Sequence, residues 1–128
     1  MTIHAHPRYL RAYGIPRSID ALLGHSLIGF DSVPSVRPLP RMPFEVSRNL
    51  FAFRCDSDVG QYAALKAGFG VGFCQVGLAK RDGLTPVLGD ELGFDLGVWL
   101  VMHKDTKASR RVRLLFEHLG AHLKTYLA

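Results

Sequence analysis

The chain has 128 residues, enough for a single domain to bury roughly two-thirds of the surface that its unfolded chain would expose. Its 48% hydrophobic and 21% charged residues exclude intrinsic disorder, collagen-like repeats and a disulfide scaffold. The net charge of +5 is divided into basic, acidic and basic blocks, which favours solubility and partner steering over a continuous nucleic-acid-binding stripe.

No targeting or membrane segment is predicted. Residues 1–7 lack the apolar stretch of a secretory signal and end at Pro7. The longest uncharged apolar run, residues 67–79, is shorter than the roughly 20 residues that a spanning helix needs. The two cysteines fit a reduced compartment, so we expect a cytoplasmic protein.

Strand and helix signals alternate from the beginning of the chain. We expect a strand at 3–5, a helix at 7–13, a short helix ending at 23 and a strand at 26–30. Pro7 suits the first position of a helix, and Gly14 suits the position after its end. Ser18 is a typical N-cap for the second helix.

The middle of the chain continues this alternation after one long loop. Four prolines between 33 and 43 exclude regular strand pairing and predict a surface loop. A strand at 50–54 and a helix at 59–67 follow, and residues 56–58 provide a helix start signal. Gly68 is placed to end this helix.

The remainder of the chain is predicted to begin with a buried strand at 71–74. A helical turn at 78–80 and an extended segment at 84–88 follow it. Residues 96–102 are apolar on both faces, which is typical of a central strand covered by helices on both sides. Ser109 then caps a final helix with one apolar stripe, formed by Val112, Leu115, Phe116, Leu119, Leu123 and Tyr126. This order predicts an α/β sheet that binds ligands at the carboxyl ends of its strands.

Several motifs have a simpler interpretation than a catalytic or metal site. The glycines at 68–72 follow a helix and open a strand, the reverse of a dinucleotide-binding turn. His118 and His122 lie four residues apart beside Glu117, but a solvated helix face is favoured over a zinc site because no third ligand is near in sequence. The pair His4 and His6 is interpreted in the same way.

The cysteines and the basic residues also leave alternatives open. Cys55 and Cys74 end or follow neighbouring predicted strands, so a redox pair is conceivable, although buried reduced thiols are the default. The basic residues around the start of the last helix favour a solvated face or an intersubunit contact over nucleic-acid binding. They are Lys104, Lys107, Arg110, Arg111 and Arg113. No catalytic residue set is apparent.

Four short motifs follow one another along most of the chain: HAHPRYLRAYGIP at 4–16, IDALLGH at 19–25, AGFGVG at 67–72 and RRVR at 110–113. In this order and spacing they resemble the effector-binding region of LysR-type transcriptional regulators. The resemblance implies a fold like that of periplasmic binding proteins, with a small-molecule cleft between two α/β subdomains. The winged helix-turn-helix, the linker helix and the first half of one subdomain have no counterpart in this chain.

The resemblance divides the chain into two parts. Residues 3–80 resemble the second subdomain, with a mixed or mostly parallel sheet flanked by helices. Residues 84–128 resemble the returning strand and helix of the first subdomain, which is incomplete here. Members of the family usually have Leu-Pro after the glycine-rich strand, and this chain has Cys74 and Gln75 instead, a change that bears on the identity of the effector.

The predicted ligand site lies at Cys55, Asp56 and Ser57, where a strand leads into a helix. Phe30 and Phe73 are expected to form its apolar walls. The carboxylates before and at the start of the helix, those of Asp56 and Asp58, could occupy its free N–H groups, so we expect this end to accept a hydroxyl, amide or ammonium group. An alternative gives Ser57 or Asp58 only a capping role.

These observations predict the effector-sensing domain of a LysR-type regulator and not an enzyme, without a cofactor or a metal. A stand-alone small-molecule binding module is the main alternative, and a small enzyme a distant one. We expect a small-molecule effector as partner. We also expect self-association into a homodimer or higher oligomer, because the apolar strand at 96–102 and the apolar stripe of the final helix need a partner surface to bury them. DNA contact should be weak and without sequence preference, since the helix-turn-helix that reads DNA is absent from this chain.

Overall fold

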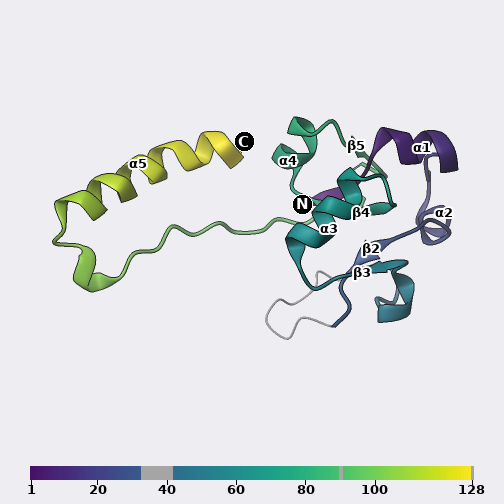
Figure 1. The fold of residues 1–128 in the computed structure, drawn as a ribbon, viewed down its shortest axis with the longest axis horizontal. Coiled ribbons are helices and arrows are strands. Elements are labelled where there is room, and N and C mark those ends of the chain that lie inside the picture. The colour runs from purple at the N-terminus through teal and green to yellow at the C-terminus, as the bar shows by residue number, and fades with distance from the viewer. Residues whose placement is uncertain (33–41, 90, 128) are drawn as a thin grey trace. The chain divides into compact units, whose positions relative to one another are not determined.

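Strands and helices alternate from Thr2 to Pro86 in a computed structural model that describes residues 1–32, 42–89 and 91–127 (Figure 1). The predicted proline-rich loop falls almost entirely outside these residues. The chain divides into two compact units, Met1–Asp95 and Leu96–Ala128. The first unit has the α/β fold that the sequence predicts.

The first unit contains five strands, four α-helices and one 3-10 helix among its described residues. They are β1 (Thr2–Ala5), α1 (Pro7–Tyr13), α2 (Ile19–Leu23), β2 (Ile28–Gly29), η1 (Arg48–Leu50), β3 (Phe53–Arg54), α3 (Asp58–Lys66), β4 (Val71–Cys74), α4 (Val76–Arg81) and β5 (Thr85–Pro86). The predicted strands at 26–30 and 50–54 are shorter than expected. The backbone N–H of Ala52 and that of Phe53 both donate to the carbonyl of Leu27, which begins the pairing of β2 with β3.

Local signals position the helix ends as predicted. Gly14 follows α1 with a φ of 85°, a conformation that a side chain would strain. The hydroxyl oxygens of Ser18 and Ser57 accept hydrogen bonds from Ala21 N at 3.1 Å and Gly60 N at 3.3 Å, which caps α2 and α3. Gly68, with a φ of 73°, ends the turn after α3.

The sheet is mixed. β1 pairs antiparallel with β4 on one side and with β5 on the other, so that Ile3 lies opposite Phe73 and Ala5 opposite Thr85. β2 and β3 form a separate parallel pair, which a parallel bridge from Leu27 to Val71 connects to β4. The antiparallel direction of β1 was not predicted. An alternating order of strands and helices predicts parallel strands only where each helix connects two neighbouring strands of the same sheet in a βαβ unit.

The core of the first unit extends beyond residue 84. Leu22, Leu65, Val71 and Val87 are almost fully buried. The N–H of Val87 donates to the carbonyl of Ile3 at 2.9 Å, and Leu92 belongs to the same apolar cluster. Residues 84–95 therefore fold with the first unit, and the unit boundary lies after Asp95. The assignment of 3–80 and 84–128 to two family subdomains stays a prediction.

The carboxylate of Asp82 links α3 to the end of α4. The side chain of Asp82 is only 14% exposed and pairs with Lys66 Nζ at 2.8 Å and Arg81 Nε at 3.2 Å. The hydroxyl of Tyr62 donates to it at 2.5 Å. These donors to the charged form hold the pKa of Asp82 far below its usual range, so the carboxylate stays ionised in the folded state.

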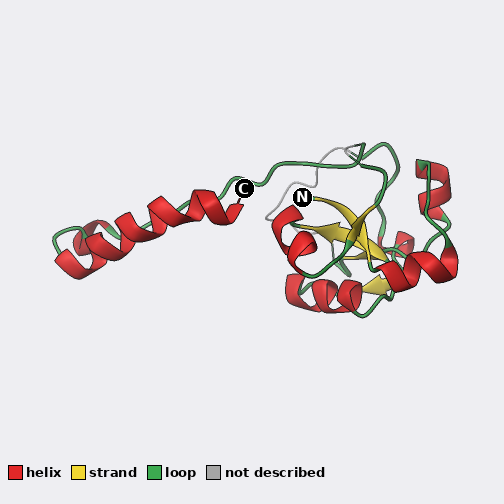
Figure 2. Cartoon of the chain, turned by 90° about the horizontal axis from the view of Figure 1, so that it is seen from above, coloured by secondary structure: helices red, strands yellow, loops and turns green. Residues whose placement is uncertain are grey.

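The prediction of a central strand at 96–102 is wrong. Figure 2 shows this stretch as a loop, and most of its side chains are exposed, with Trp99 at 85% and Val101 at 81%. No strand of the described residues pairs with it. An apolar segment cannot form a strand alone, because its backbone groups need a neighbour to bond.

The second unit also contains the predicted final helix. The elements of this unit are the 3-10 helix η2 (Lys104–Thr106) and the final helix α5 (Arg110–Leu127). Ser109 precedes α5, and its carbonyl accepts the first helical hydrogen bond, from Arg113 N at 3.0 Å. Val112, Phe116 and Leu123 of the predicted stripe are half-buried, whereas Leu115 and Leu119 are exposed.

Candidate functional site

A cavity of about 90 Å³ lies beside β2 and β4 of the first unit. Most of its wall is apolar and aromatic, with Met42, Phe44, Leu50 and Phe51 facing strand residues such as Ile3, Ile28 and Val71. Its polar lining residues are Asp31, Ser32, Ser47 and Arg48. An apolar cavity with a few polar groups is the usual form of a small-molecule site.

Two of the predicted site residues, Phe30 and Phe73, line this cavity. Phe30 directly follows β2, and Phe73 lies within β4. Because these two strands are neighbours, both residues line the same cavity. Phe73 is half-buried and packs against Phe94, with ring centroids 5.3 Å apart. This packing orders the ring that forms the wall.

An ion pair stands at the polar part of the cavity. Arg48 donates to Asp31 Oδ1 through Nη2 at 2.8 Å and Nε at 3.1 Å, and Arg54 Nε lies 3.7 Å from the same oxygen. Both side chains of the closest pair are about half exposed, so water screens the attraction. The pair orients the Arg48 side chain at the cavity wall.

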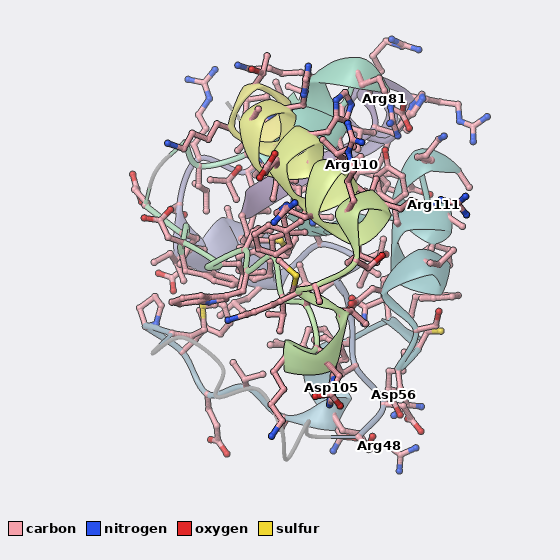
Figure 3. The ribbon with its side chains drawn as sticks, turned by 90° about the vertical axis from the view of Figure 1, so that its left-hand side faces the viewer. Arg48, Asp56, Arg81, Asp105, Arg110 and Arg111 are labelled. Carbon is pink, nitrogen blue, oxygen red and sulfur yellow. The ribbon has the colours of Figure 1, made fainter. Side chains whose placement is uncertain are left out.

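Asp56 supports the turn that lines the cavity. Its Oδ1 accepts hydrogen bonds from the backbone N–H of Asp31 and of Ser32, each at 2.9 Å, and its Oδ2 accepts one from the Ser32 hydroxyl at 2.7 Å. These bonds to the charged form lower the pKa of Asp56. Figure 3 shows Asp56 and Arg48 at the same end of the first unit. The expectation that Asp56 occupies N–H groups of α3 is wrong, because its carboxylate is used by the turn after β2.

Cys55 and Ser57 lie beside Asp56 without lining the cavity. The N–H of Cys55 donates to Gly29 O of β2 at 2.9 Å, and its carbonyl accepts from Gln61 Nε2 of α3 at 2.6 Å, so this residue links β2 to α3. Ser57 caps α3. Both cysteines are free thiols, and burial raises the pKa of Cys74.

Sequence reasoning missed the lining residues of the segment 42–51. The 3-10 helix η1, which was not predicted, brings Arg48 and Leu50 toward β2. Apolar residues at 44 and 46 alternate with polar residues at 45 and 47, and this short alternation was the available signal.

The family described as LysR substrate binding domain matches residues 1–124 of this chain. The chain belongs to this family. No curated protein matches it. Among solved structures, the regulatory domain of CrgA, a LysR-type transcriptional regulator from Neisseria meningitidis, matches 95% of the chain with a TM-score of 0.75 and 22% identity. A structure of CrgA itself matches 93% of it with a TM-score of 0.70 and 24% identity.

The match to the CrgA structures establishes the fold of this LysR substrate-binding domain. The chain covers 63% of the CrgA regulatory-domain chain and 44% of the other CrgA chain. The α/β architecture with a fold like that of periplasmic binding proteins is thereby confirmed. No described helix of this domain is both long and apolar enough to cross a membrane.

Proposed function

We propose that this LysR substrate-binding domain senses a small-molecule effector in the cavity beside β2 and β4. The observation that carries the proposal is an apolar cavity with a pre-formed polar side, made by Asp31, Ser32 and Arg48. In a complete regulator of the cytoplasm, occupancy of this cavity would control transcription through a separate DNA-binding part. The matched structures are those of a LysR-type transcriptional regulator and of its regulatory domain, which favours sensing over catalysis.

The cavity favours a small and largely apolar ligand. About 90 Å³ gives room for on the order of three water-sized groups. The N–H groups of Asp31 and Ser32 are already used by Asp56, so they cannot bind a ligand carboxylate. A hydroxyl or amide group on the ligand fits the side chains of Ser32 and Ser47 better.

Screening small aromatic and aliphatic alcohols and amides by thermal shift tests the proposal. Phe73→Ala should weaken binding of the best compound by at least about tenfold, since it removes an aromatic wall. Phe53→Ala is the matched control, because Phe53 is also half-buried in an aromatic pair, 5.5 Å from Phe69, but does not line the cavity. Equal loss of calorimetric affinity in both variants would contradict the assignment of the site.

The exposed apolar residues of the second unit support self-association of the domain. Leu96, Val98, Trp99 and Val101 are 42% to 85% exposed, and large apolar patches on a monomer are uncommon. Trp99 is the only tryptophan of the chain, so its fluorescence reports directly on this segment.

We expect the emission of Trp99 to shift to shorter wavelength as the protein concentration rises into the high micromolar range. Burial of the indole against a second copy removes it from water, which causes the shift. Light scattering should show the mass rising over the same range. A monomeric mass together with an unchanged emission maximum would argue against self-association through this segment.

A further inference from the structure

Two exposed histidines of α5 lie one helical turn apart. The rings of His118 and His122 stack with centroids 4.1 Å apart and planes inclined by 30°. Both residues are exposed, so their rings can turn without disturbing the core. Residues four positions apart on a helix face the same side, and two histidines at this spacing can bind one metal ion.

A hydrogen bond selects the tautomer of one of these rings. His122 Nδ1 lies 2.8 Å from the carbonyl oxygen of His118. Because a carbonyl oxygen can only accept, Nδ1 carries the hydrogen, and in the neutral ring Nε2 keeps its lone pair. Metal-binding histidines commonly donate one ring N–H to a carbonyl in this way, which orients the ring and raises the basicity of the other nitrogen.

We propose that His118 and His122 form a chelating site for a divalent transition-metal ion of the Cu²⁺, Ni²⁺ and Zn²⁺ group. Imidazole nitrogens suit these ions, and hard ions such as Mg²⁺ prefer oxygen ligands. No group of three or more potential ligands occurs among the described residues, so water completes the coordination shell. The bound ion joins two successive turns and thereby restrains the second half of α5.

Calorimetric titration of the whole chain with NiCl₂ alone, in a buffer that does not bind metals, tests this site. We expect about one ion per chain at the strongest site. His118→Gln and His122→Gln should each weaken this binding by at least about tenfold, because each leaves a single ligand. Glutamine is a good helix former, so both variants should keep α5.

His103→Gln is the matched control. His103 is another exposed histidine of the second unit, with Nδ1 accepting from Asp105 N at 3.3 Å, and its replacement should leave nickel binding unchanged. In the parent chain, nickel should also slow hydrogen exchange of the α5 amides, and in His122→Gln it should not. Unchanged binding in both α5 variants, or an equal loss in His103→Gln, would overturn the proposal.

Discussion

Replacing Gly70 with alanine is expected to lower the free energy of unfolding by about 3 kcal/mol or more. A Cβ at this position would lie 2.0 Å from the carbonyl oxygen of Ser26. That oxygen accepts the N–H of Val71 at 2.9 Å and so belongs to the contact between the start of β2 and β4. The backbone cannot move away without breaking this contact, so strain or local rearrangement must follow.

Gly24→Ala is the control for Gly70→Ala. Its Cβ would meet only Ala21 O at 3.4 Å, an ordinary contact, and its φ of −82° suits any residue. We expect a change in unfolding free energy within about 0.5 kcal/mol there. Urea denaturation of the two variants measures the difference. Similar urea midpoints for the two variants would show that the backbone at residue 70 lies farther from the carbonyl oxygen of Ser26 than in the structure.

Replacing Asp56 with alanine is expected to weaken effector binding by more than about tenfold. The substitution removes the three hydrogen bonds that Asp31 and Ser32, two residues of the cavity lining, donate to the Asp56 carboxylate. The turn must then be ordered when the ligand binds, and that ordering reduces affinity. Calorimetry with the best compound from the thermal-shift screen measures the loss.

Ser57→Ala separates this role from helix capping. It should lower stability by about 1 kcal/mol through loss of the α3 cap, with ligand affinity unchanged. Asp56→Asn should lie between the parent and Asp56→Ala, because its amide oxygen still accepts the two N–H groups while its NH₂ group cannot accept from the Ser32 hydroxyl. If Asp56→Ala lost stability but bound the compound as the parent does, Asp56 would have only a structural role.

The predicted site residues lie in or beside the cavity because their position depends on chain order. A strand followed by a helix places Asp56 near the end of a sheet strand, whatever the details of packing. Phe30 and Phe73 could be chosen for the same reason, since each occurs in or directly after a strand. The partners of Asp56 could not be predicted, because they lie 24 and 25 residues away in sequence.

The sequence by itself determined the ends of α1, α2 and α3 to within about one residue and the alternating order of the first unit, whereas α4 is longer than the predicted turn at 78–80. Pro7, Ser18 and Gly68 act within one or two turns of their own position, so their effect does not depend on distant residues. Local hydrogen bonding and allowed backbone angles are sufficient for such predictions.

Only the tertiary structure decided the direction of β1, the shape of the cavity and the state of residues 96–102. The apolar run at 96–102 predicts a strand, yet the described residues offer it no pairing partner and it remains a loop. A strand and a cavity both depend on groups supplied from elsewhere in the chain. The residue pattern of one segment shows whether that segment could form a strand or line a cavity. Whether a neighbouring strand or an opposite cavity wall is present depends on the tertiary fold.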